Sequence, residues 1–417
     1  MRRSARLVSI AAVASYFIAV AERSSLGVAA LEASQRFDVT AAQLSSLTVM
    51  QLMVYAAMQI PVGVLLDRYG SRMLIVAGAV LMAVGQVLVA NSEVLAQAVI
   101  GRGILGMGDA FTFISMIRLI NHWYSGPAAT RRTQFYANIG QLGQVFSALP
   151  FSALLHTVGW SLSYLALAAM ALLSAIIVWT WVQDSPGHHS AAVKTATWSA
   201  VGRQLIENAK NPGVRMAFWV HFACQSSGSV FVLLWGYTYL VRGQGVSPTL
   251  AGVMLSSFVA IGFLVGPILS NVCATRPELR ARLVVVVVLI TVAAWALVLI
   301  WPGNSPTILI WLLIFALGSG GPASMIAFDF TRSFIKSDRM GTANGLVNMG
   351  GFIATFTIMY AVGFVLDLSL KLGWSQSLFD PNGLRISMLV QFAILALGLV
   401  FFRIERVRFS RQAHPVE

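Results

Sequence analysis

The chain has 417 residues, of which 57% are hydrophobic and only 10% are charged, and its mean hydropathy is +0.77. This composition excludes a water-soluble enzyme or nucleic-acid-binding domain, since such domains carry far more charge, even though the net charge is +13. The two cysteines, Cys224 and Cys273, lie within or beside apolar segments, so we expect neither a disulfide framework nor a metal site.

A helix needs roughly 20 consecutive apolar residues to cross a membrane. Twelve segments meet this requirement, and they predict an all-α integral membrane protein with twelve transmembrane helices. The first segment is too long, and too polar in its second half, for a cleaved signal peptide. The expected spans lie near residues 8–30, 42–66, 73–90, 95–119, 134–156, 160–182, 215–240, 249–271, 282–301, 306–329, 341–366 and 384–403.

The first span carries two adjacent charged residues, Glu22 and Arg23. Charges inside a membrane span are costly, so they mark functional positions more often than other residues do. Neighbouring residues on an α-helix point about 100° apart, so these two side chains cannot face the same way.

A short polar turn, Gly63-Val-Leu-Leu-Asp67-Arg68-Tyr-Gly70-Ser-Arg72, joins the second and third spans. Gly70 permits a tight reversal, because glycine adopts backbone angles that other residues resist. Asp67, Arg68 and Arg72 therefore lie within one short turn.

The fourth span contains Arg102 and Asp109, which are seven residues apart and therefore share one helix face. We expect Glu22 to pair with Arg102, leaving Arg23 and Asp109 to face a cavity. The alternative is a static ion network of all four groups that only sets helix packing. Arg118, near the end of the span, is interpreted as a snorkelling anchor.

The remaining spans offer uncharged polar candidates for substrate binding. Any of them could instead form only a hydrogen bond between helices. His221 in the seventh span is expected to pack rather than to relay protons. The candidates are Asn138 and Gln141 in the fifth span, Gln225 in the seventh, and Asn344 and Asn348 in the eleventh.

A polar stretch divides the spans six and six, which predicts an N-terminal bundle at 1–182, a cytoplasmic linker at 183–214 and a C-terminal bundle at 215–417. His188 and His189 in the linker lack a third ligand for a metal. The halves repeat weakly, as in Val62-Gly63 and Val265-Gly266. Such repeats commonly enclose a substrate site near mid-membrane.

The repeat fails at the charged positions, because Asp109 aligns with Gly321 and Asp67 with Ser270. The intramembrane charges therefore belong to the first half alone, and helix packing shared by both halves does not explain them.

The distribution of basic residues predicts orientation. When both termini are placed in the cytoplasm, most of the 28 Lys and Arg residues fall on the cytoplasmic side, as the positive-inside rule requires. We therefore expect a multi-pass protein of the cytoplasmic (inner or plasma) membrane. The basic residues left outside are Arg36, Arg242, Lys371 and Arg385.

The turn at 63–72 resembles the signature loop between the second and third helices of the major facilitator superfamily. Glu22-Arg23-Ser-Ser-Leu-Gly-Val-Ala and Arg102-Gly-Ile-Leu-Gly-Met-Gly-Asp109-Ala are similar to runs in the anion:cation symporter family, which has Asp and Glu at the two acidic positions. The resemblance implies the major facilitator fold, two pseudo-symmetric six-helix bundles, with gating by the signature loop.

These features predict a proton-coupled symporter that imports a small organic anion by alternating access. Asp109 and then Glu22 are the expected proton-coupling sites, and Arg23 and Arg102 the expected anion-binding groups. The four charges sum to zero when all are ionised, and protonation of one acid leaves a positive site that favours a carboxylate. We expect a monomer whose partners are the anion, protons and the lipid bilayer, with no nucleic acid, cofactor or metal.

Three alternatives remain open at this point. A proton-antiport exporter of drugs or metabolites would bind its substrate through ionised Asp109. A nitrate-type anion carrier is suggested by Gly345-Leu-Val-Asn348-Met-Gly-Gly351, although spans two and eight lack that family's arginines. A non-transporting sensor or scaffold would not need the gating loop. No enzyme signature or Gly-rich phosphate loop is present, so we expect no enzymatic activity.

Overall fold

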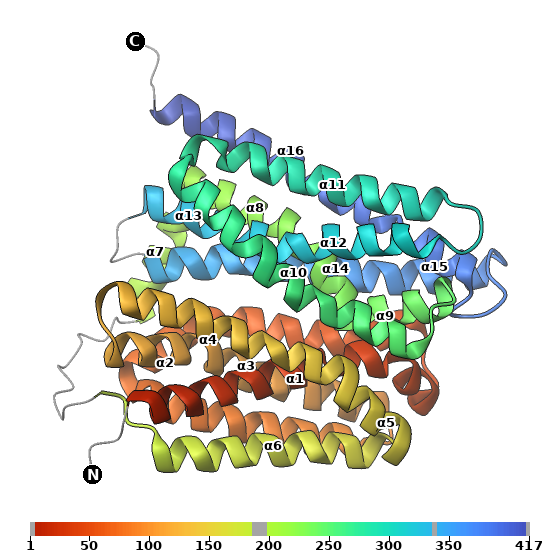
Figure 1. Cartoon of the computed structure of the whole chain (residues 1–417), viewed down its shortest axis with the longest axis horizontal. Coiled ribbons are helices and arrows are strands. Elements are labelled where there is room, and N and C mark those ends of the chain that lie inside the picture. The colour runs from red at the N-terminus through yellow and green to blue at the C-terminus, as the bar shows by residue number, and fades with distance from the viewer. Residues whose placement is uncertain (1–4, 186–197, 336–339, 414–417) are drawn as a thin grey trace. The chain divides into compact units, whose positions relative to one another are not determined.

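Long helices make up the computed structural model of the chain, which describes residues 5–185, 198–335 and 340–413 (Figure 1). His188 and His189, for which the sequence offers no third metal ligand, lie outside these ranges. Ten helical segments within the described ranges are long and apolar enough to cross a membrane. One of them, residues 41–90, contains the second and third expected spans. A further, more polar helical segment at residues 126–158 accounts for the fifth span. The prediction of an all-α protein with twelve spans is therefore confirmed.

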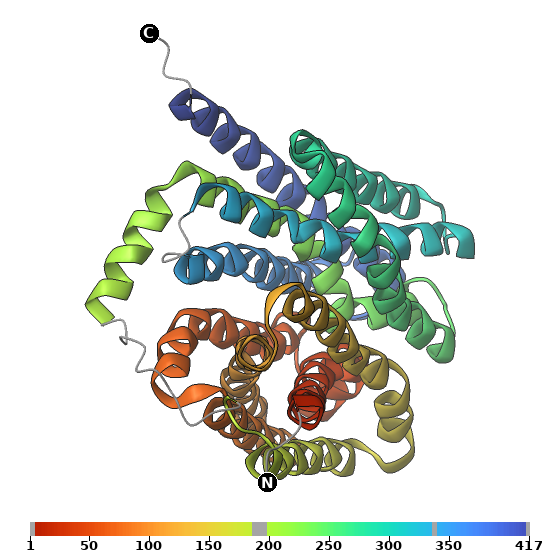
Figure 2. The same cartoon turned by 60° about the vertical axis from the view of Figure 1, so that its left-hand side comes forward.

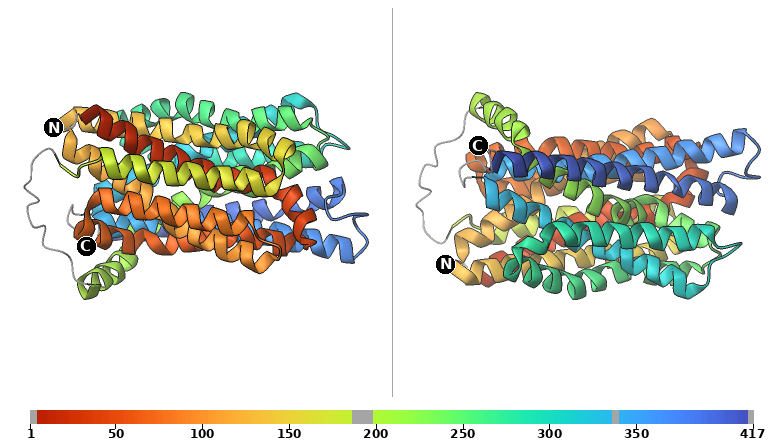
Figure 3. Two further views of the ribbon diagram at one scale, coloured as in Figure 1. Left: turned by 90° about the horizontal axis from the view of Figure 1, so that it is seen from below. Right: turned by 90° about the horizontal axis from the view of Figure 1, so that it is seen from above.

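The helices form two compact units. Unit 1 comprises residues 1–39 and 46–197, and unit 2 comprises residues 40–45 and 198–417. The spanning helices within each unit run roughly parallel or antiparallel to one another (Figure 3). The exact limits of the expected bundles and of the linker at 183–214 stay a prediction.

Unit 1 is built around its first helix, which packs against α3, α4 and α6 (Figure 2). Apolar residues of α1, among them Val8, Ala12 and Val20, form a core with neighbouring helices. The helices of unit 1 are α1 (Ala5–Phe37), α2 (Ala41–Ala90), α3 (Leu95–Trp123), α4 (Gly126–Phe146), the π-helix Ser147–Phe151, α5 (Ser152–Val158) and α6 (Trp160–Trp181).

Close approach of α4 to α1 depends on glycine. A Cβ atom at Gly143 would overlap the backbone carbonyl oxygen of Phe17, and one at Gly140 would overlap the Tyr16 ring. Small residues let membrane helices approach closely, so these two glycines fix how α1 sits against α4. The rotation of α1 then decides where Glu22 and Arg23 point.

The 50-residue helix α2 contains the second and third expected spans. It is interrupted at Gly70, whose backbone angles (φ 79°, ψ 168°) are not helical. A left-handed φ of this kind favours glycine, so the break occurs where the sequence predicts a tight reversal.

Unit 2 is organised around α8, which packs against α12, α13, α14 and α16. Its core includes Val220, Val284 and Val347 from three different helices. Its main helices are α7 (Trp198–Lys210), α8 (Pro212–Val230), α9 (Gly236–Thr238), α10 (Pro248–Thr275), α11 (Arg280–Ile300), α12 (Thr307–Ser324), α13 (Ile326–Phe334), α14 (Met340–Lys371), α15 (Pro381–Met388) and α16 (Val390–Ala413). Shorter turns are the π-helices Phe231–Trp235 and Tyr239–Gly243 and the 3-10 helix Pro277–Leu279.

Candidate functional site

A buried ion pair joins α1 to α3 inside unit 1. Arg23 donates from Nε to Asp109 Oδ2 at 2.6 Å and from Nη2 to Oδ1 at 2.7 Å. The Asp109 side chain is fully buried, and that of Arg23 is only 14% exposed. Two parallel charge-assisted bonds of this length are the strongest form of a carboxylate–guanidinium contact.

Arg102 does not make the contact that the sequence suggested. Its guanidinium donates to the backbone carbonyl oxygens of Glu22 (3.4 Å) and Arg23 (3.3 Å) and to the hydroxyl of Ser25 (3.3 Å). The expected pairing of Glu22 with Arg102 is therefore wrong, because Arg102 holds the backbone of α1 rather than its acidic side chain. The acid that forms an ion pair is Asp109, and its partner is Arg23.

Glu22 is the second buried acid of unit 1, with no exposed surface. Neither of its carboxylate oxygens accepts a hydrogen bond of normal geometry from the described residues. The amide of Gln86 on α2 lies beside the Glu22 carboxylate and likewise has no hydrogen-bond partner of normal geometry among the described residues. Glu22 thus differs from Asp109 in forming no ion pair within the part of the chain that the structure describes.

Aromatic and amide groups complete the surroundings of the ion pair. The Arg23 guanidinium lies 4.7 Å from the centre of the Tyr55 ring, a distance that permits a cation–π contact. Tyr16, two turns before Arg23 on α1, accepts a hydrogen bond of 2.8 Å from Gln141 on α4. Asn138, one turn before Gln141, is exposed. One face of the Arg23 guanidinium therefore lies toward the Tyr55 ring, and one edge of it donates to the Asp109 carboxylate.

The polar candidates of unit 2 lie on α8 and α14. Gln225 donates to Ser229 at 2.9 Å and accepts from Ser324 at 3.0 Å, so α8 is hydrogen-bonded to α12. Asn344 and Asn348 are half-buried and one turn apart on α14. The three predicted positions carry amides, Ser229 and Ser324 carry hydroxyls, and none of these five side chains is charged.

Two acids hold the expected gating loop: Asp67 within it, and Asp184 just after α6. Asp67 forms an ion pair of 2.7 Å with Arg118 of α3. The interpretation of Arg118 as a snorkelling anchor stays a prediction. Asp184, just after α6, accepts a hydrogen bond of 2.9 Å from the backbone N–H of Arg72. A Cβ at Gly70 would lie 2.9 Å from Asp184 Oδ2.

The other residues of the loop differ in how closely they are held. Arg72 donates from its side chain to the Trp179 carbonyl oxygen at 2.6 Å, and its guanidinium lies over the Trp179 ring. Arg68 is exposed beside the ring of Tyr69. Gly63 has open space where a Cβ would be. The loop is therefore fixed to α3 and α6 through its charged residues.

Sequence reasoning missed Gln86 and Asp184. Gln86 could have been noticed as an amide in the otherwise apolar third span. Asp184 gave no such signal, because an acid at the polar end of a span is unremarkable. Among the described residues, no group of three or more His, Cys, Asp or Glu side chains could hold a metal ion.

A comparison with protein families decides the class of the chain. The profile of the major facilitator superfamily matches residues 12–359. The chain belongs to the major facilitator superfamily. This is a family of membrane transporters and not of enzymes, so the transporter is a multi-pass membrane protein, and the fold and family expected from the signature loop are confirmed.

Distant relatives of the transporter are carriers of organic anions. It is 23% identical over 404 residues to the probable galactarate/D-glucarate transporter GudP of Bacillus subtilis, covering 86% of this chain and 83% of the relative. It is 26% identical over 177 residues to the probable sulfoacetate transporter SauU of Cupriavidus necator, covering 42% and 41%. The expected resemblance to anion:cation symporters is confirmed by these relatives.

A solved structure confirms the fold of the transporter. It aligns with a bacterial homolog of the human lysosomal transporter Spinster in an inward-facing, occupied conformation, with a TM-score of 0.75. The alignment covers 97% of each chain at 16% identity, so it concerns the fold alone.

Proposed function

We propose that the transporter is a proton-coupled symporter that imports a small organic anion. The observation that carries this proposal is the bidentate pair between Arg23 and Asp109. While Asp109 is ionised it occupies the guanidinium edge that would otherwise bind a substrate carboxylate. Protonation of Asp109 removes this competitor, and the anion takes its place on Arg23.

Charge balance supports the same coupling. Glu22, Arg23, Arg102 and Asp109 are all buried or nearly so in unit 1 and sum to zero when ionised. One proton gives the site a net positive charge, which favours an anion. Loss of that proton inside the cell restores neutrality and weakens binding, so proton and anion each raise the affinity for the other.

Asp109 is the principal coupling acid in this proposal, and Glu22 is the second. Asp109 controls the anion-binding arginine directly, whereas Glu22 contacts no cation among the described side chains. Arg102 acts as a permanent positive charge near the anion while it holds α1. The amides Asn138, Gln141, Gln225, Asn344 and Asn348 are proposed to bind hydroxyl groups of the substrate.

The substrate class follows from the relatives. Galactarate, D-glucarate and sulfoacetate, named for the relatives, all carry carboxylates, and sulfoacetate also carries a sulfonate. A guanidinium binds either group through two parallel N–H donors. We therefore propose sugar acids or other small carboxylates as substrates of this transporter.

The signature loop is proposed to gate the cytoplasmic side. Asp67 and Arg118 tie the loop to α3, and Asp184 ties it to the end of α6. Both contacts lie within unit 1. They would keep the loop in one shape while the helices around it change position. We further propose that both termini are cytoplasmic, that the membrane is the cytoplasmic one and that the transporter is a monomer.

Uptake into proteoliposomes tests the proposal. Purified transporter is reconstituted with an acidic outside or with equal pH on both sides, and radiolabelled D-glucarate, galactarate or D-glucose is added. We expect a sugar acid to accumulate only when the outside medium is acidic, and we expect no accumulation of D-glucose. Accumulation driven by an acidic inside would instead indicate antiport, and gradient-independent uptake would contradict proton coupling.

A further inference from the structure

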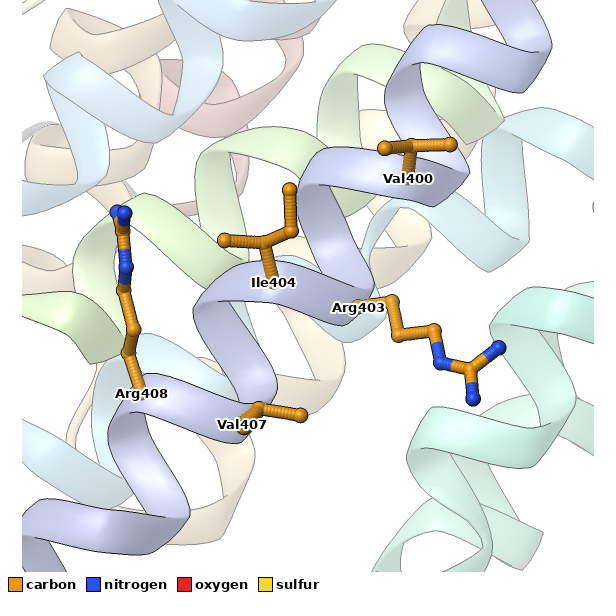
Figure 4. Close-up of a pocket in the computed structure, with 5 residues that line it drawn as sticks. All are labelled: Val400, Arg403, Ile404, Val407 and Arg408. Carbon is orange, nitrogen blue, oxygen red and sulfur yellow. The ribbon is translucent and has the colours of Figure 1, made fainter.

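An apolar face with one arginine lies on the outer side of α16. Val400, Arg403, Ile404 and Val407 follow the spacing i, i+3, i+4, i+7 and so share one helix face. They line a groove of about 400 Å³, and the three apolar side chains are 38–55% exposed. Figure 4 shows them along α16, with Arg403 and Arg408 extending to opposite sides.

The same pattern recurs on α11 and the turn before it. Leu279, Arg282, Leu283 and Val286 follow the identical spacing, with the arginine again at the second position. They line a smaller groove of about 200 Å³, and Arg282 and Val286 are exposed. Two helices of unit 2 thus present an arginine beside an apolar stripe.

The two arginines lie toward the same end of unit 2. Arg282 is at the start of α11 and Arg403 is in the second half of α16, and these ends of the two helices lie on the same side in Figure 1. The two helices also pack against each other. The arginines therefore reach one leaflet of the bilayer.

Glu405, two residues after Arg403 on α16, is already paired. Glu405 is 3.0 Å from Arg215 and 2.7 Å from Arg408, so a single carboxylate serves two guanidinium groups. Arg282 and Arg403 form no hydrogen bond or ion pair with any described residue, although both are exposed. Each of these two arginines therefore carries a positive charge that forms no ion pair with a described acid.

We propose that the α11–α16 edge of unit 2 binds an anionic phospholipid. The guanidinium groups of Arg282 and Arg403 contact the headgroup phosphate and its negative charge, and the acyl chains follow the apolar stripes toward mid-membrane. Basic pockets on the outside of membrane helices bind acidic headgroups in this way. Side chains as long as arginine can place their charge at headgroup level while their stems stay beside the chains.

Native mass spectrometry of the purified full-length transporter tests this site. The protein in detergent is mixed with equal amounts of phosphatidylglycerol and phosphatidylcholine of the same acyl chains, and retained lipids are counted. We expect preferential retention of phosphatidylglycerol. Each of R282Q and R403Q should lower that preference about fivefold, because one basic residue near a membrane surface contributes this much attraction.

The matched control is R242Q, which removes an exposed arginine from the opposite end of unit 2 and should leave the preference unchanged. Thermal unfolding in detergent checks that the variants fold, and no change is expected because Arg282 and Arg403 have no protein partner among the described residues. Equal retention of both lipids by the native protein would overturn the proposal. So would undiminished preference in the R282Q/R403Q double variant.

Discussion

Replacing Asp109 with asparagine should strengthen anion binding and remove its pH dependence. Asparagine has one acceptor oxygen, so one of the two bonds to Arg23 is lost and the other becomes a bond to a neutral group. A hydrogen bond to a charged group contributes roughly 1.5–3 kcal/mol, and the bond that remains still involves the charged guanidinium. The competition for Arg23 then falls by the one lost bond, roughly 1.5–3 kcal/mol, which corresponds to about 10- to 150-fold tighter binding at neutral pH.

Calorimetric titration of the detergent-purified protein with D-glucarate, at intervals from acidic to alkaline pH, measures the effect. Native affinity should fall as pH rises, because ionised Asp109 recaptures Arg23, whereas Asp109→Asn should show a flat profile. The same variant in proteoliposomes should exchange D-glucarate across the membrane yet fail to concentrate it. Weaker binding that still depends on pH would refute this reasoning and make Asp109 a structural partner. Persisting pH-driven accumulation would move the coupling role to Glu22.

Three further outcomes are expected. Arg23→Lys keeps the charge but loses one of two parallel donors, so D-glucarate binding by calorimetry should weaken roughly 10- to 150-fold; normal binding would show that Arg23 only packs. Asp67→Asn should slow proteoliposome uptake with little change in affinity, and a large loss of affinity in a folded protein would argue against gating. Gly143→Ala forces a Cβ onto a backbone carbonyl and should cost roughly 1–3 kcal/mol of stability in thermal unfolding, while Gly262→Ala, with open space around it, should not destabilise.

The sequence was sufficient to predict the spans and the family, because apolar length and loop motifs are local properties. The four intramembrane charges were also visible, since a charge stands out in an apolar segment. Their pairing was not predictable, because Glu22 and Arg23 are neighbours and either could face α3. Which of the two side chains faces α3 depends on the rotation of α1 about its axis. That rotation is set by the close contact of α1 with Gly140 and Gly143 of α4.

The signature loop likewise has features that the sequence predicts and contacts that it does not. Its position and the break at Gly70 follow from the residues themselves. Its contacts with Arg118 and Asp184 do not, because they join segments about 50 and 110 residues away in the chain.

The contact between Asp184 and Arg72 also has a consequence for how the protein is made. The ribosome delivers the second and third spans well before the end of the sixth, and domains assemble from the N-terminus as they emerge. The hairpin around Gly70 therefore enters the membrane with its Arg72 amide lacking the Asp184 carboxylate that finally accepts its hydrogen bond. The hydrogen bond from Arg72 to Asp184 can form only after residue 184 has been synthesised. The contacts of the signature loop are therefore complete only when nearly all of unit 1 has been made.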